Sequence, residues 1–264
     1  MVLERLISLK DALSHPWWMF VIGGAVSIIC LFISFLLFPQ SIGLFTSFLI
    51  TLAMTPFMLK LVTYEEATTE KEIENHINKN FFQRHSHILS IYTAFFAGAI
   101  LFLSIAFLTL PESTVQKLFE DQIKEINLIR GSVLFTSTLG KIVFNNIGVL
   151  LLSVILSFLF GAGAIFILAW NASILATAIG LTAKSIGGIH SLPLAVLVYF
   201  PHGSLEILAY FIGAISGGMI SAAFIKKNSK LFWSVTKDSL MLVELAIVIL
   251  VIAGVIETTS IVIS

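Results

Sequence analysis

The sequence has little charge and almost no cysteine, and each shortage excludes a class of protein. Charged residues make up only 11% of the 264 residues, well below the about 25% of an ordinary soluble domain. The fifteen basic and fifteen acidic residues leave no net charge, which argues against nucleic acid as a partner. The single cysteine, Cys30, excludes a disulfide within the chain and every CxxC-type metal site.

The sequence motifs of common catalytic sites are also missing. There is no GxSxG nucleophile motif and no glycine-rich phosphate-binding loop followed by lysine. Neither the cysteine nor any serine lies in a recognisable nucleophile motif. We therefore expect a protein that is not an enzyme, and we assign it no catalytic residue, no metal site and no cofactor.

Long apolar runs dominate the chain, in which hydrophobic residues make up 58% of the sequence. A membrane-spanning helix needs about 20 mostly apolar residues. Six runs reach or approach this length: 17–38, 42–62, 88–110, 142–170, 203–224 and 239–257. The first run has no small-residue cleavage site after it, so we expect a retained anchor and not a signal peptide. The pattern predicts an all-α, polytopic transmembrane helix bundle.

The segment 171–200 does not fit a single straight helix, because it contains Lys184, the pair Gly187-Gly188, His190 and a proline. We expect a broken or re-entrant crossing, which is tolerated where protein or water covers the backbone. Counted as one crossing, this segment brings the predicted total to about seven spans.

Basic residues are distributed unevenly between the connections on the two sides of the membrane. With seven crossings, ten Lys or Arg residues lie on the side of the N-terminus and four on the other side. The positive-inside rule then places the N-terminus in the cytoplasm and the C-terminus outside. We expect a multi-pass protein of the cell (plasma) membrane.

Two polar connections are predicted to form amphipathic helices at the membrane surface. Residues 69–72 and 113–116 each match a capping box, and apolar residues then recur at helical spacing. No separate soluble domain is visible. Residues 1–264 are therefore expected to form one integral membrane domain, with an N-terminal helical hairpin at 17–62 and a C-terminal span at 239–257.

The motif Pro201-His202-Gly203-x-x-Glu206 is the most unusual feature of the apolar segments. We expect a turn that starts a helix, with the imidazole and the carboxylate on one helix face at i, i+4 spacing. Three interpretations stay open: a device that fixes the helix start, a site for a transported ion or proton, or a catalytic metal site. A zinc site needs three protein ligands, and His190 is the only obvious third candidate.

Small residues recur at helical spacing in three of the later segments, where they would allow close approach of helix backbones. We predict that 142–170, 171–200 and 203–224 form a tight inner bundle. The predicted packing residues are Ser153, Ser157, Gly161, Gly180, Gly213 and Gly217. The predicted polar contents of the bundle are Asn145, Asn146, Asn171, Lys184, His202 and Glu206.

Several of these residues together resemble the stage II sporulation protein M family. The resemblance rests on Asn145-Asn146-Ile-Gly148, Gly161-Ala-Gly163, Asn171 and above all Pro201-His202-Gly203-x-x-Glu206, and it defines a family-like core at 88–225. It implies a polytopic membrane scaffold, which in spore-forming bacteria acts with two peptidoglycan-degrading partners during engulfment. Relatives also occur in bacteria and archaea that make no spores.

Three functions are consistent with the sequence. The first is a non-enzymatic membrane scaffold that positions envelope- or membrane-remodelling proteins, with the lipid bilayer, membrane or envelope proteins and a further copy of the chain as possible partners. The alternative is a transporter or channel-like protein with a polar cavity lined by Asn171, Lys184, His202 and Glu206, and with His190 as a possible further lining residue. A more distant third is an intramembrane metal-dependent hydrolase that uses His202, Glu206 and His190.

Overall fold

The computed structural model describes residues 8–74, 83, 85–130, 135–160, 163–225 and 229–263, and these contain helices but no strand. The helices are α2 Leu9–Ser14, α3 Trp17–Leu37, α4 Ile42–Glu74, α6 Ser86–Thr109, α7 Glu112–Leu118, α8 Glu120–Arg130, α9 Phe135–Phe160, α10 Ala164–Ile186, the 3-10 turn η1 Gly188–Ser191, α11 Leu192–Ile225 and α12 Ser229–Ile263. The prediction of an all-α chain is confirmed.

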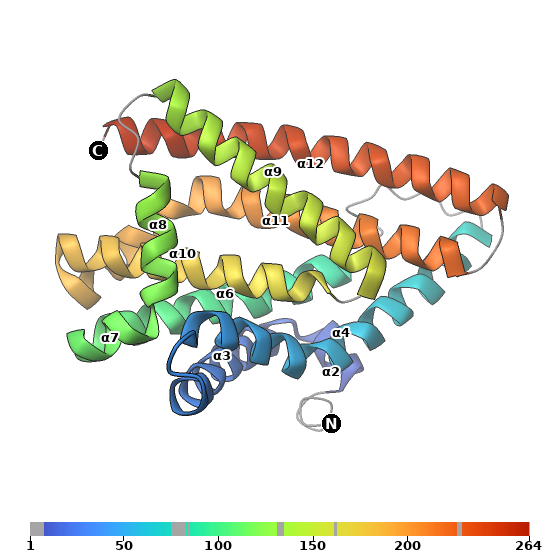
Figure 1. Ribbon diagram of the computed structural model, residues 1–264. Coiled ribbons are helices and arrows are strands. Elements are labelled where there is room, and N and C mark those ends of the chain that lie inside the picture. Colours follow the sequence, from blue (N-terminus) through green and yellow to red (C-terminus); the bar gives the residue numbers. More distant parts are fainter. Residues whose placement is uncertain are drawn as a thin grey trace.

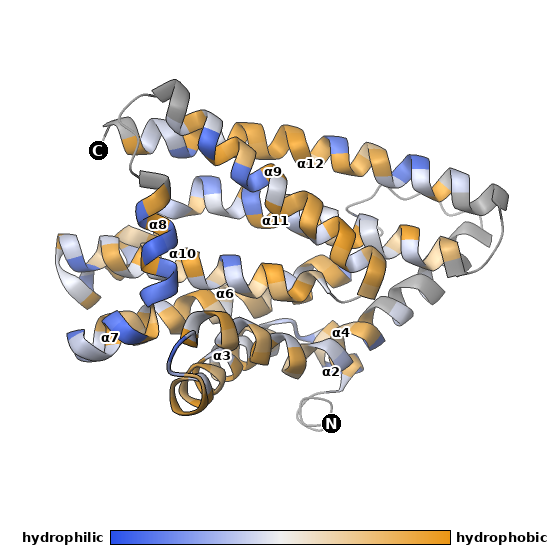
Figure 2. Cartoon of the chain, viewed as in Figure 1, coloured by the Kyte–Doolittle hydropathy of each residue, from blue (hydrophilic) through white to orange (hydrophobic). Residues whose placement is uncertain are grey.

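Seven of these helices are long and apolar enough to cross a membrane, as the sequence predicted. They are α3, α4, α6, α9, α10, α11 and α12, and they pack side by side as one bundle (Figure 1). The short helix α8 runs across α10 instead of along it (Figure 1). Hydrophobic residues line the long helices, whereas α8 carries much of the hydrophilic surface in this view (Figure 2). The chain is therefore a polytopic membrane protein.

The boundaries predicted for the fourth and fifth crossings are wrong. Their membrane spans run Thr138–Phe160 and Ala164–Ile186, so one span ends and the next begins inside the predicted run 142–170. The segment 171–200 is neither re-entrant nor a single crossing. It forms the end of α10, the turn η1 and the start of α11. Gly188 makes this turn possible, because its φ of 74° lies in the left-handed region that favours glycine.

Pro201 lies inside α11, so the expectation that Pro-His-Gly starts a helix is also wrong. The helix that contains the motif begins earlier, at Leu192, with Pro193 in its first turn. Proline is well tolerated there, because the first amide groups of a helix have no partner within the helix. The membrane environment favours continuation of the helix through Pro201, because every backbone group left open would have to find another partner.

The two surface helices differ from their predicted form. Thr69 does not start a helix, since α4 continues without interruption from Ile42 to Glu74; the rest of that predicted helix lies outside the described residues. The second connection forms two helices, α7 and α8, with Phe119 between them. Pro111 is the N-cap of α7, and no side chain caps this helix. Phe119 is buried against Phe107 of α6, which explains the bend at this position.

Close backbone contacts hold the bundle together at two helix crossings. A Cβ atom on Gly217 of α11 would collide with the backbone of Val154 on α9, and Ser157 of α9 is buried beside it. The predicted small-residue contact between the fourth and sixth segments is therefore present between α9 and α11. The fifth segment departs from the prediction, because Gly180 packs against Phe107 of α6 and not within an inner bundle.

The second close crossing joins α3 to α6 and was not predicted. A Cβ on Gly23 would collide with the backbone of Phe95, and a Cβ on Gly98 would collide with the backbone of Phe20. Each glycine thus accepts the backbone of the other helix. Of the predicted packing residues, Ser153 is fully buried on α9, Gly213 packs against Leu150, and Gly161 lies outside the described residues.

We expect Gly217→Leu to destabilise the protein by about 1–3 kcal/mol or more, because the new side chain must push α9 and α11 apart. Gly218→Leu is the matched control, since a Cβ at Gly218 meets no atom within 4 Å. Thermal unfolding in detergent compares the two variants. Equal unfolding temperatures would show that α9 and α11 are not in close contact at Gly217.

Candidate functional site

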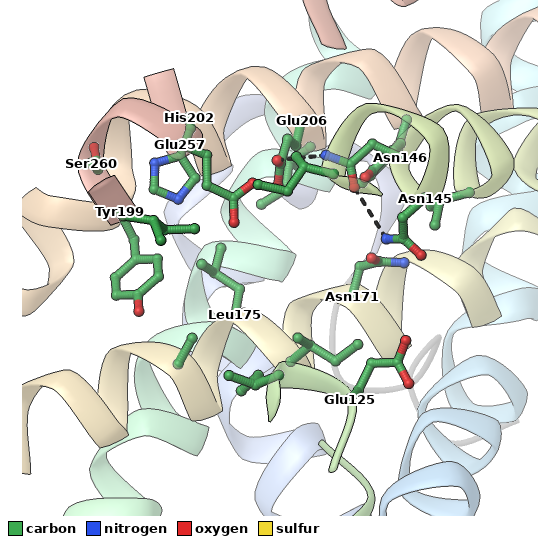
Figure 3. Close-up of a pocket in the computed structure, with 18 of the residues that line it drawn as sticks. Glu125, Asn145, Asn146, Asn171, Leu175, Tyr199, His202, Glu206, Glu257 and Ser260 are labelled. Carbon is green, nitrogen blue, oxygen red and sulfur yellow. Dashed lines mark hydrogen bonds between the residues drawn. The ribbon is translucent and has the colours of Figure 1, made fainter. Parts of the chain in front are cut away.

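A pocket of about 280 Å³ lies among helices α8 to α12 (Figure 3). Asn145 and Asn146 enter it from α9, Asn171 from α10, and His202 and Glu206 from α11. These residues lie within or beside the membrane spans of their helices. The structure thus brings together five of the polar residues that the sequence singled out.

Glu206 is held by a chain of two asparagines on α9. Asn146 Nδ2 donates a hydrogen bond to Glu206 Oε1 at 2.7 Å, and Asn145 Nδ2 donates to Asn146 Oδ1 at 3.3 Å (Figure 3). Asn146 is buried, whereas Asn145 is exposed. This hydrogen bond joins α9 to α11, so Asn146 fixes both the carboxyl group and the register of the two helices.

A second carboxyl group completes this cluster and was missed by the sequence analysis. Glu257 of α12 points toward Glu206 (Figure 3), and both carboxyl groups line the same pocket. Glu125 of α8 also lines the pocket, on the opposite side in this view. In the sequence, only the position of Glu257 at the end of the last apolar run distinguished it as a candidate site residue. Its distance of 51 residues from Glu206 gave no indication of contact.

His202 is only 4% exposed and lies at the wall of the pocket. Its ring is 5.5 Å from the ring of Tyr199, whose hydroxyl group lies 3.1 Å from Thr182 Oγ1 on α10. The Nδ1 atom of His202 has no hydrogen-bond partner among the described residues. A buried polar atom without a partner is costly, so a water molecule or ligand that bonded to Nδ1 would stabilise this part of the site.

The other predicted site residues have more ordinary places. Asn171 lines the pocket, but its Nδ2 donates to the carbonyl oxygen of Ile167 in its own helix. Pro201 is exposed, and Gly203 is buried, with Leu175 next to the position of a Cβ.

Two residues predicted to line a polar cavity do not do so. Lys184 is exposed and forms an ion pair with Glu112 of α7. His190 is exposed in η1 and is not among the residues that line the pocket. Both residues lie at or next to the turn at Gly187–Gly188 that joins α10 to α11. Glu206 lies further along α11, away from this turn.

Within the described ranges, no three His, Cys, Asp or Glu side chains are close enough together to hold a metal ion. His190 therefore does not supply the third ligand that the hydrolase interpretation needs. What the pocket offers is a carboxyl pair, amide groups and an unpartnered imidazole nitrogen within largely apolar walls. Such walls with a few convergent polar groups are typical of sites for small molecules.

The fold and the site define a polytopic membrane protein with an acidic pocket inside its helix bundle. The family model for stage II sporulation protein M matches residues 90–260, about two thirds of the chain. The chain belongs to this family. The match includes most of α12 and therefore Glu257, whereas the resemblance read from the sequence ended at residue 225. No curated protein and no solved structure gives a significant match.

We expect Asn146→Ala to destabilise the protein by about 1–3 kcal/mol, because it leaves the buried carboxyl group of Glu206 without its donor. Asn145→Ala is the matched control, since the exposed Asn145 contacts Glu206 only through Asn146. Unfolding in a denaturing detergent measures both. A smaller loss for Asn146→Ala than for Asn145→Ala would contradict the assigned role of this hydrogen bond.

Proposed function

We propose that the protein is a non-enzymatic scaffold of the plasma membrane that positions envelope- or membrane-remodelling proteins. The observation that favours this function is the length of α4. Its membrane span covers Ile42–Leu61, but the helix continues to Glu74. At about 1.5 Å per residue, the part of the helix beyond the span is about 20 Å long. We call residues 62–74 the α4 extension.

The α4 extension is strongly acidic. It contains Glu65, Glu66, Glu70, Glu72 and Glu74, against one basic residue, Lys71. A segment of this charge is complementary to a partner surface of opposite charge. The partner class that fits this helix is therefore a membrane or envelope protein with a basic surface next to the bilayer.

The distribution of Lys and Arg supports a cytoplasmic location for the α4 extension. With seven spans, the ten basic residues on the side of the N-terminus lie on the same side as this extension. The N-terminus is then cytoplasmic, and the C-terminal end of α12 lies on the outer side of the membrane together with α7 and α8.

Neutralising the α4 extension tests the scaffold function. We expect the combined change Glu65→Gln, Glu66→Gln and Glu70→Gln to remove partners that crosslink to the wild-type protein in native membranes. The physical reason is the loss of charge complementarity, while glutamine keeps the helix propensity of the segment. Affinity purification after mild crosslinking, at equal expression, gives the readout.

The control for this experiment carries the same change in charge on the opposite side of the membrane. Glu112→Gln, Glu120→Gln and Asp121→Asn alter α7 and α8 and should leave the crosslinked partners unchanged. An identical set of partners in both variants, or none with the wild type, would contradict the scaffold function. Labelling of Thr63→Cys and Ser113→Cys in a Cys30→Ala background, with a membrane-impermeant maleimide on intact cells, checks the orientation. Both positions are exposed and lie outside the spans, and only Ser113→Cys on α7 should react.

A transporter or channel-like function is the second candidate, and the pocket at Glu206 favours it. Ionisable side chains within membrane spans commonly belong to the path of an ion or a polar solute. Flux of a solute into proteoliposomes that is lost in Glu206→Gln would support transport. Flux that Glu206→Gln leaves unchanged would argue against it.

A further inference from the structure

Each of the five helices around the pocket contributes a polar side chain to its walls. These are Glu125 of α8, Asn145 of α9, Asn171 of α10, His202 of α11 and Ser260 of α12. Carboxylates accept hydrogen bonds, whereas amide and hydroxyl groups both donate and accept them. None of the described residues that line the pocket is a lysine or an arginine, which argues against an anionic ligand. A ligand must instead match donors and acceptors on several sides.

His202 brings an unused hydrogen-bonding atom to the wall of this pocket. It is only 4% exposed, and its Nδ1 atom has no hydrogen-bond partner among the described residues. Its ring points into the pocket beside Tyr199 (Figure 3). A neutral imidazole has one nitrogen that donates and one that accepts. A ligand group that can do both would pair with either nitrogen and would remove the cost of a buried imidazole without a partner.

Asn171 offers a second unused atom, on the neighbouring helix. Its Nδ2 atom donates to the carbonyl oxygen of Ile167 at 2.8 Å, a bond that does not engage its Oδ1 atom. Asn171 and His202 line the same pocket, and Glu206 lies between them in Figure 3. A molecule that reaches both side chains must therefore carry more than one hydrogen-bonding group.

The size and the remaining walls of the pocket limit the ligand further. The volume of about 280 Å³ lies just below the range of about 300–1,000 Å³ that is typical of small-molecule sites. Trp170 and Tyr210 line the pocket together with aliphatic side chains, and these walls suit the C–H groups of a ligand. A single sugar ring combines these properties, because it has hydroxyl groups around its edge and C–H groups on its faces.

We propose that this pocket binds a small uncharged polyol, about the size of one sugar ring, whose hydroxyl groups form hydrogen bonds with His202, Asn171 and Glu206. Each hydroxyl both donates and accepts, so one kind of group pairs with an imidazole, an amide and a carboxyl group alike. A free polyol and the polyol headgroup of a lipid share this chemistry. Binding requires neither a partner protein nor flux, so its failure would leave the scaffold and transport functions untouched.

Saturation-transfer NMR of the full-length protein in lipid nanodiscs tests this site. The probes are glycerol, D-glucose and myo-inositol, with ethylammonium and acetate as small charged probes and protein-free nanodiscs as the blank. We expect at least one polyol to bind and neither ion to do so. Nanodiscs that contain a glucosyl diacylglycerol distinguish the two sources: loss of the free polyol's signal identifies a lipid headgroup as the occupant, and an unchanged signal identifies the free molecule.

His202→Phe keeps a planar ring beside Tyr199 and leaves the hydrogen bond between Asn146 and Glu206 in place. We expect it to weaken polyol binding by about tenfold or more, because the ring nitrogens are lost. The thermal stability of the ligand-free protein should stay the same or rise, because a buried polar atom without a partner is removed. The matched control is His190→Phe, the same change at an exposed residue outside the pocket, which should bind as the wild type does.

Asn171→Leu removes the second unused atom and should also weaken polyol binding, so the site can be tested even if His202→Phe fails to fold. Three outcomes would overturn the proposal. They are no binding of any of the three polyols, binding of a charged probe alone, and polyol binding that a folded His202→Phe variant or Asn171→Leu leaves unchanged.

Discussion

Glu206 lies among apolar helices, and a carboxyl group in such a place must receive hydrogen bonds from the protein or be exposed to water. Asn146 of α9 provides the nearest donor, at 2.7 Å. This contact requires α9 and α11 to lie close together, and the absence of a side chain at Gly217 allows it. The polar contact and the packing of small residues thus depend on each other. Gly217 permits the close approach of α9 and α11, and the hydrogen bond between Asn146 and Glu206 fixes the register of the two helices.

The rest of the site follows from this arrangement. With α11 fixed against α9, α12 packs along α11 and brings Glu257 to Glu206. Helix α8 lies across α10, where Gln122 Nε2 donates to Ser173 Oγ at 3.1 Å, and this places Glu125 at the pocket. The acidic pocket is therefore built from helices on both sides of the motif in α11, and it belongs to the part of the chain that defines the family.

The sequence predicted the class of fold, the number of spans and most of the polar residues on α9, α10 and α11. Apolar run length and small-residue spacing are local signals, and they were sufficient for these features. The position of the turns was predicted less well, because Gly161 and Gly163 interrupt an apolar run without any polar residue, whereas Pro201 looks like a helix break and is not one. Glu257 and Glu125 reach the pocket through tertiary packing alone, which a single sequence does not reveal.

The hydrogen bond between Asn146 and Glu206 is tested most directly by a double-mutant cycle. Asn146→Ala, Glu206→Gln and the combined variant are unfolded under the same conditions as the wild type. Residues in direct contact show interaction energies of about 0.5–3 kcal/mol, and we expect a value in this range for the pair. The same cycle with Asn145→Ala should give a smaller value. An interaction energy of zero for Asn146 and Glu206 would contradict the account of how α9 and α11 are held in register.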